Sequence, residues 1–477
     1  MASVKKNFAF NVLLVISNIV FPILVFPYIA RILGPKGLGD AHFALQFSKW
    51  FVTVASLGIP IYGLREVAKV KNNKVKLGKL VSELLALNVI TAGISSIVYI
   101  VALGFSTTLQ QNMQLFAVAG LQVALGFLSI DWLFYGLEDF RTITYRALSV
   151  RIVTVFFLVW FITTPQDAFP YLVISIVSIS VAHLWNLFYA FTRVELSFKS
   201  LQITKHLKPI LLIFLMNVCI TMYTVFDTVW VGFLSTSAAV GLYTSATKLS
   251  KVSIPLVSAL GTVLMPRSAR TFAANITNPQ HLQTSFNFIV DMAIPIAVGI
   301  CLLTPELLLL FSGEAFLQAT TAMRILSVLP LCIGLNNLFG MQILSASGND
   351  KLLLWCVFLG MIVNIILNLL LVPNLAHTGA AIAITITEFT VTLATFYLAF
   401  TKFAIRFNFN RIPQTLLLSL LFVPIVFGIK YLHLGNLITV SISVLLCLNV
   451  YVWIQYLVFK NEFMVHAISI IKNKINS

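Results

Sequence analysis

The segment Arg65-Glu66-Val67-Ala68-Lys69-Val70-Lys71-Asn72-Asn73-Lys74-Val75-Lys76-Leu77-Gly78-Lys79 lies between two apolar stretches, each long enough to cross a bilayer. It carries six basic residues and a single acid, Glu66. A basic loop between two spans stays on the cytoplasmic side, because Lys and Arg resist translocation during insertion. The segment therefore predicts a membrane protein and assigns this loop to the cytoplasm, from which the side of every other loop follows.

The composition agrees with an integral membrane protein. Of the 477 residues, 59% are hydrophobic and only 10% are charged, unlike a soluble domain. The formal net charge of +16 would favour nucleic acid as the partner of a soluble protein. Here the basic cytoplasmic loops account for the charge, so the lipid bilayer is the expected partner and nucleic acid is not.

Continuous apolar runs predict fourteen transmembrane helices, since about 20 residues are needed to cross the hydrocarbon core. The predicted spans are residues 8–30, 38–62, 80–104, 114–136, 144–163, 169–191, 209–234, 239–265, 286–311, 324–346, 352–373, 378–401, 413–432 and 436–459.

Basic residues orient these spans. With the N-terminus inside, 24 of the 31 Lys and Arg residues fall in predicted cytoplasmic stretches. Only Arg31, Lys36, Arg324 and Lys430 fall in outer loops or rims. This asymmetry predicts a multi-pass protein with both termini in the cytoplasm.

A short polar pattern occurs twice in the chain. Residues 38–49 (LGDAHFALQFSK) align without gaps to residues 240–251 (VGLYTSATKLSK), an offset of 202 that also carries Arg65 onto Arg267. A second pair of similar segments, 136–141 (GLEDFR) and 346–351 (ASGNDK), follows an even-numbered span in each half. Shared apolar composition is the alternative explanation, but it does not account for the aligned polar positions.

The repeat predicts the domain organisation. Both copies begin on the cytoplasmic side, so the repeat is parallel and its pseudo-twofold axis runs along the membrane normal. We expect an all-α polytopic membrane protein in which two six-helix lobes surround a central cavity. The expected parts are an N-terminal lobe at 1–192, a cytoplasmic linker at 193–208, a C-terminal lobe at 209–404, and two additional spans with a cytoplasmic tail at 405–477.

Three motifs resemble the polysaccharide transporters, the O-antigen and capsule repeat-unit flippases of the multidrug/oligosaccharidyl-lipid/polysaccharide exporter superfamily. They are residues 27–39 (PYIARILGPKGLG), 58–68 (GIPIYGLREVA) and 135–140 (YGLEDF). The resemblance implies a V-shaped cavity lined by cations and a bacterial inner-membrane location. The implied cargo is a polyprenyl-diphosphate-linked oligosaccharide, and the implied partners are the polymerase and glycosyltransferases of the same pathway.

A polar stripe with cations lies within the predicted spans. His42, Gln46 and Lys49 follow one another at i, i+4 and i+7, which places them on one helix face. The second repeat has Lys248 and Lys251 at matching depth. A charge at this depth is costly and should face protein or water, so we expect these lysines to bind an anionic cargo in the cavity. The alternative is that they pair with acids between helices.

Three further basic residues are candidates for binding or gating. Arg31, at the outer end of the first span, would bind the diphosphate at the exit, or would be an interfacial snorkelling arginine. Arg65 and its repeat partner Arg267 lie at cytoplasmic span ends, where they would form a gate or simply anchor the topology.

The acids near or inside spans have different expected roles. Asp227 and Glu388 are deep enough to carry a coupling proton or sodium ion, unless a lysine holds them ionised. Glu83 and Asp291 lie near cytoplasmic ends and are expected to be exposed. Asp131 is expected to pair with Arg141 or Arg151.

Other polar residues in the spans are expected to be structural. Arg146 and Arg151 should snorkel toward the cytoplasmic end of the fifth span. The asparagines Asn336, Asn337, Asn364 and Asn368 are expected to make hydrogen bonds between helices.

Two other functions compete with a flippase. A multidrug or cation antiporter of the same superfamily should have an acidic or neutral cavity, unlike the lysine stripe. A membrane glycan polymerase or acyltransferase needs a catalytic group on a sizeable outer loop, and the predicted outer loops are short. The sequence contains no Ser-His-Asp grouping, phosphate loop or metal cluster, so neither enzymatic activity nor a cofactor is expected.

Overall fold

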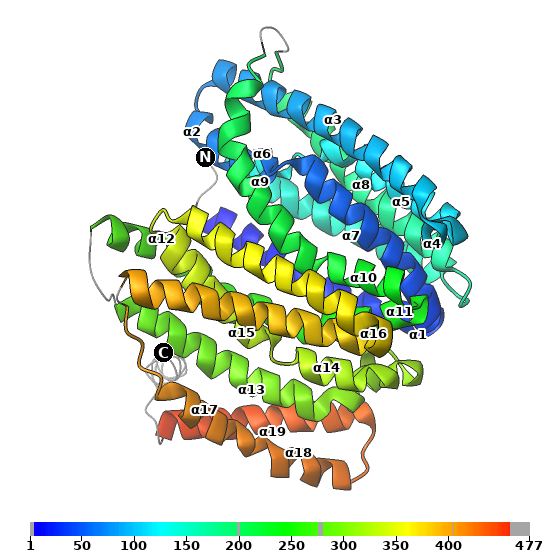
Figure 1. Cartoon of the computed structure of the whole chain (residues 1–477), viewed down its shortest axis with the longest axis vertical. Coiled ribbons are helices and arrows are strands. Elements are labelled where there is room, and N and C mark those ends of the chain that lie inside the picture. The colour runs from blue at the N-terminus through cyan, green and yellow to red at the C-terminus, as the bar shows by residue number, and fades with distance from the viewer. Residues whose placement is uncertain (1–3, 198–200, 275–279, 404, 458–477) are drawn as a thin grey trace. The chain divides into compact units, whose positions relative to one another are not determined.

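The computed structural model describes residues 4–197, 201–274, 280–403 and 405–457, and every regular element in these ranges is a helix (Figure 1). This confirms the predicted all-α fold class. The chain divides into two compact units, which are described separately. Unit 1 comprises Met1–Ser245 and Lys351–Thr390, and unit 2 comprises Ala246–Asp350 and Val391–Ser477. The lobe boundaries expected from the repeat stay a prediction.

Unit 1 is built from long helices and several short ones that continue or cap them. Its elements are α1 (Val4–Ser56), α2 (Ile59–Val70), α3 (Lys74–Phe105), α4 (Thr107–Gln111), α5 (Met113–Ala124), η1 (Gly126–Leu128), α6 (Asp131–Gly136), α7 (Phe140–Phe161), α8 (Ala168–Arg193), α9 (Thr204–Thr224), α10 (Phe226–Leu234), the first part of α11 (Ser237–Lys251) and most of α16 (Asp350–Phe403).

Unit 2 contains the remaining helices. Its elements are the end of α11, α12 (Ile254–Ala273), α13 (Gln280–Phe311), η2 (Glu314–Ala319), α14 (Thr320–Leu326), α15 (Leu329–Asn336), η3 (Asn337–Ser345), the end of α16, α17 (Arg411–Leu420), α18 (Phe422–Tyr431) and α19 (Asn436–Leu457).

The predicted spans all have helical counterparts. In the described part of the chain, eleven helices are long and apolar enough to cross a membrane, or twelve if the bent pair α11–α12 is counted as one span. Both α1 and α16 contain two predicted spans, joined at kinks at Gly34 (φ 63°) and Ala376 (φ 48°). The two kinks account for the difference between twelve and the fourteen predicted spans.

A reciprocal backbone contact within unit 1 supports the offset of 202. A Cβ added at Gly39 of α1 would lie 1.7 Å from the Ser237 carbonyl oxygen, and one at Gly241 of α11 would lie 1.9 Å from that of Pro35. Pro35 and Ser237 are themselves 202 positions apart, as are the two glycines. A twofold axis generates such swapped contacts, because equivalent residues exchange roles across it.

The second pair of similar segments forms the same turn in each unit. Glu138 and Gly348 both have positive φ, at 60° and 75°. The next residue closes the turn in the same way, with Asp139 N donating to Phe134 O and Asn349 N donating to Leu344 O, both at 2.9 Å. These are 6→1 helix C-terminal caps, so similar sequences produce similar local structure.

Two of the motif glycines permit close packing of α2 against α6. A Cβ at Gly63 would lie 2.6 Å from the indole ring of Trp132. A Cβ at Gly136 would lie 2.6 Å from the side chain of Val67. Gly63 of α2 thus leaves room for Trp132 of α6, and Gly136 of α6 leaves room for Val67 of α2. This packing explains why both motifs contain a glycine in the sequence YGL.

In unit 2, the last two spans pack along α13, as the orange and red helices do in Figure 1. Asp291 on α13 is 3% exposed and binds Thr415 Oγ1 at 2.9 Å and Arg411 Nε at 3.3 Å. Farther along α13, Glu306 pairs with Lys430 Nζ at 2.9 Å. The expectation that Asp291 would be exposed is therefore wrong, because α17 covers it.

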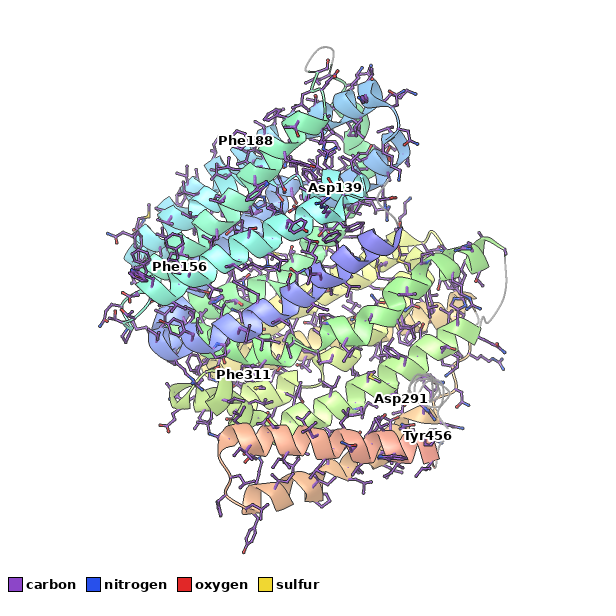
Figure 2. The ribbon with its side chains drawn as sticks, turned by 180° about the vertical axis from the view of Figure 1, so that it is seen from behind. Asp139, Phe156, Phe188, Asp291, Phe311 and Tyr456 are labelled. Carbon is purple, nitrogen blue, oxygen red and sulfur yellow. The ribbon has the colours of Figure 1, made fainter. Side chains whose placement is uncertain are left out.

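The outer faces of both units are apolar, as a lipid-facing surface requires. Phe156 on α7 is 59% exposed and Phe188 on α8 is 69% exposed, and Figure 2 shows both on the outside of unit 1. Polar side chains are instead collected between the helices.

Candidate functional site

A buried acid that accepts hydrogen bonds from three side chains forms a well-defined polar cluster in unit 1. Asp227 lies in the first turn of α10 and is 1% exposed. Its Oδ1 accepts hydrogen bonds from Asn364 Nδ2 at 2.9 Å and Asn368 Nδ2 at 3.0 Å, and its Oδ2 accepts one from Tyr243 at 3.2 Å. The two asparagines are four residues apart on α16 and therefore share a helix face.

The second half of α16 completes this cluster. Thr387 Oγ1 lies 3.3 Å from Asn364 Nδ2, and the next residue, Glu388, is 4% exposed. Tyr223 of α9 lies within Coulombic range of Glu388. Carboxylate, amide and hydroxyl oxygens are ligands for hard cations, and a carboxylate can also take up and release a proton. The asparagines thus make the expected interhelical hydrogen bonds, and they make them to one of the two acids expected to couple transport.

The stripe on α1 lies on a helix that also contacts α8 and α10. His42 is buried at 5% exposed, with Nε2 3.5 Å from the Tyr171 hydroxyl group of α8. Gln46 is half-buried, and Lys49 is exposed. The stripe therefore runs from a packed end to an accessible cation.

Aromatic side chains connect the stripe with the acid cluster. Trp50, next to Lys49, contacts Phe226 with ring centroids 5.4 Å apart, and Phe226 contacts Trp230 at the same distance. Phe226 directly precedes Asp227. The backbone positions of Lys49 on α1 and Asp227 on α10 are thus joined by one cluster of packed aromatic rings.

The other predicted cations lie at accessible positions. Lys248 is exposed and Lys251 is half-buried at the end of α11 in unit 2. Arg31, Arg65 and Arg267 are all exposed. A cavity that brings the lysines of both repeats together stays a prediction.

A second buried cluster was not expected from the sequence. Glu83 of α3 is fully buried and accepts hydrogen bonds from Lys205 Nζ at 2.7 Å, His206 Nε2 at 3.0 Å and the backbone N of Gln202 at 3.0 Å. His206 Nδ1 lies 2.8 Å from the Tyr62 hydroxyl group of α2. The prediction that Glu83 is exposed is wrong, because the segment entering α9 folds over it.

A third polar cluster is formed by Asp131, which is half-buried, and the buried Arg146. Arg146 is 7% exposed, and its Nη1 lies 2.7 Å from Asp131 Oδ1, which also accepts a hydrogen bond from Asn186 at 2.7 Å. Asp131 therefore pairs with neither Arg141 nor Arg151, and Arg146 does not snorkel. The pair lies between α6, α7 and α8.

Comparisons with known proteins place the chain in a family and identify its fold. A family model described as polysaccharide biosynthesis protein matches residues 4–272, and one described as MatE matches residues 213–370. A protein of Shigella dysenteriae named as an O-antigen transporter is 21% identical over 395 residues, covering 82% of this chain and 98% of that protein.

Two solved structures share the fold. The lipid II flippase MurJ in an inward closed conformation aligns with a TM-score of 0.73 at 14% identity, covering 96% of this chain and all of MurJ. An inward-facing multidrug resistance MATE family transporter of the MOP superfamily aligns with a TM-score of 0.61 at 15% identity, covering 81% of this chain and 94% of that protein.

These findings define a multi-pass membrane protein with the fold of MurJ and of the MATE family transporter. Because the first family model matches more than half of it, the chain belongs to the polysaccharide biosynthesis protein family. The resemblance seen in the motifs is thereby confirmed, and the relatives that the chain matches are named as transporters and flippases, in line with the expectation of a transporter rather than an enzyme.

Proposed function

We propose that the protein moves a polyprenyl-diphosphate-linked oligosaccharide from the inner to the outer leaflet of a bacterial inner membrane. The observation that carries this proposal is the family match over residues 4–272, the part of the chain that contains the lysine stripes. The name of the Shigella relative and that of the lipid II flippase support a lipid-linked glycan as cargo. Both termini would lie in the cytoplasm. The proposed partners are the glycosyltransferases that make the cargo and the polymerase that consumes it after translocation.

The lysines are proposed to bind the diphosphate. Lys49 and Lys248 are exposed and Lys251 is half-buried, so their ammonium groups can reach a ligand. Lysine provides a point charge with several donors, which suits a cargo that must also be released. His42 and Gln46 would orient the stripe, Arg31 would act near the exit, and Arg65 with Arg267 would act at the cytoplasmic gate.

Ion coupling is proposed to act through Asp227, with Glu388 as a second candidate. Asp227 is buried, and its carboxylate oxygens accept hydrogen bonds from Tyr243, Asn364 and Asn368, so a proton or sodium ion taken up there would act directly on these bonds. Binding a cation there would change the hydrogen bonds that join α10, α11 and α16. Transport would then proceed by alternating access, as expected for two repeats around a midplane site.

A multidrug antiporter is the second candidate, favoured by the MatE match over residues 213–370. Its cargo would be cationic, and the lysines would then repel it. Removing lysines should therefore improve drug export but impair glycan export. The two activities change in opposite directions in the same variants.

The test is complementation of a strain that lacks its own repeat-unit flippase. We expect Lys49→Ala, Lys248→Ala and Lys251→Ala to reduce surface polysaccharide at unchanged membrane expression, and Lys→Arg to be milder. Lys76→Ala, at an exposed lysine in the first turn of α3, is the matched control. Wild-type polysaccharide in all three stripe variants would contradict the anionic-cargo proposal.

A further inference from the structure

Arg151 occupies an unusual place for a guanidinium group. It is the twelfth of the 22 residues of α7 and is therefore near the middle of a membrane span. It lies seven residues after Thr144, whose Oγ1 donates to the Phe10 carbonyl oxygen of α1 at 3.0 Å. Both residues thus belong to the face of α7 that packs against α1, and Arg151 is half-buried there.

The partners of Arg151 are neutral. Nη1 donates to Ser17 Oγ and Nη2 donates to Asn18 Oδ1, both on α1. The guanidinium carbon also lies 5.9 Å from the centroid of the Phe21 ring. In the described part of the chain, no carboxylate lies within ion-pair distance of Arg151.

The nearby acid is already engaged. Asp131 pairs with Arg146 at 2.7 Å and also accepts a hydrogen bond from Asn186. The carboxylate of Asp131 is therefore bound by Arg146, five residues before Arg151 on α7, and not by Arg151. A charge at mid-membrane is costly without a counter-charge, and intramembrane ionisable groups usually mark a ligand or ion path.

We propose that Arg151, with Ser17 and Asn18, forms a binding site for a phosphate group between α1 and α7. Arginine presents planar donors that match two phosphate oxygens at once, and the serine hydroxyl and asparagine amide add neutral donors beside it. The phosphate supplies the missing counter-charge. Two sources share this chemistry: the diphosphate of a prenyl-linked cargo and the headgroup of an anionic phospholipid. The first source rests on the proposed function.

The binding test uses the full-length protein purified in detergent. Isothermal titration calorimetry measures its affinity for inorganic pyrophosphate, farnesyl diphosphate and a short-chain phosphatidylglycerol. We expect Arg151→Gln to weaken diphosphate binding at least about tenfold, since one charge-assisted hydrogen bond is lost. Arg151→Lys keeps the charge but not the two-oxygen match, so it should have an affinity between those of the wild type and Arg151→Gln. Arg141→Gln, at an exposed arginine of the same helix, is the matched control and should bind like the wild type.

The variants also separate binding from packing. Glutamine can still donate to Ser17 or Asn18, so a purely structural arginine would leave the affinities of Arg151→Gln unchanged, which would overturn the proposal. Weakened binding of the diphosphates alone supports the cargo as source, and weakened binding of phosphatidylglycerol as well supports a phospholipid site. Failure of the wild-type protein to support glycan export would overturn the proposed function but leave phosphate binding measurable.

Discussion

The crossing of α1 and α11 gives a sharp test of the repeat. Gly39→Ala would place a Cβ 1.7 Å from the Ser237 carbonyl oxygen, and Gly241→Ala would place one 1.9 Å from the Pro35 carbonyl oxygen. Both obstacles are backbone atoms, which cannot rotate away as a side chain could. The helices must therefore separate or tilt at this point.

The expected magnitude follows from two opposing terms. Replacing a helical glycine by alanine favours the helix by up to about 1 kcal/mol. Overpacking costs about 1–3 kcal/mol, and a rigid backbone contact should be at the upper end of that range. We expect a net loss of about 2 kcal/mol in the free energy of unfolding for either variant. Since the unfolding entropy of a chain of this length is about 1 kcal/mol/K, the melting temperature should fall by about 2 °C.

The assay is thermal unfolding of the purified protein in one detergent. Gly93→Ala and Gly104→Ala, at glycines of α3 with nothing within 4 Å of the added Cβ, are the matched controls and should melt at or slightly above the wild-type temperature. The double variant Gly39→Ala/Gly241→Ala should lose less than the sum of the two, because both changes open one crossing. Melting of Gly39→Ala and Gly241→Ala together with the controls would refute the reciprocal contact.

Three further outcomes are expected. Glu83→Ala should lower the free energy of unfolding by about 2 kcal/mol, because buried donors lose their acceptor, whereas Glu66→Ala at the exposed pair with Lys69 should cost under about 1 kcal/mol; equal melting temperatures would contradict this. Asp227→Asn should leave the melting temperature nearly unchanged but abolish the dependence of transport on a proton or sodium gradient, and unchanged gradient dependence would exclude Asp227 as the coupling acid. Backbone N–H groups of Thr163 and Thr164 donate to Asp167 and lower the pKa of its carboxyl group. The stabilising effect of the carboxylate is therefore present above the unfolded-state pKa of about 4 and is lost as pH falls through the lower folded value. Asp167→Asn should remove that part of the acid sensitivity of the melting temperature, and identical pH profiles of the variant and the wild type would argue against it.

The fold was largely predictable because its signals are local. Each span is a continuous apolar run, and the basic loops give its orientation. The repeat was visible through a few aligned polar residues, and the glycines within it, Gly39 and Gly241, prove to meet where the repeated helices cross. The similarity of residues 136–141 to 346–351 was also visible in the sequence, and Glu138 and Gly348 prove to have the same positive-φ position in the two turns.

The buried clusters were harder to predict because their members come from distant parts of the chain. Glu83 lies near a predicted span end, and nothing local indicates that a segment 119 to 123 positions later folds over it. Arg146 was expected to snorkel. It binds Asp131 instead, which lies on the preceding helix and approaches Arg146 only through helix packing. Asp227 and the Asn364–Asn368 pair were each recognisable, but their contact spans 137 positions or more and depends on tertiary packing.

The most direct test of the central claim is leaflet translocation in proteoliposomes. A polyprenyl-diphosphate oligosaccharide with a fluorescent sugar is incorporated into both leaflets, and a membrane-impermeant reductant then quenches the outer label. With the wild-type protein, quenching should continue beyond the outer fraction as inner-leaflet cargo reaches the surface, and Lys49→Ala should slow this phase. Quenching that stops at the outer fraction with well-folded wild-type protein, under every imposed proton or sodium gradient, would contradict the account.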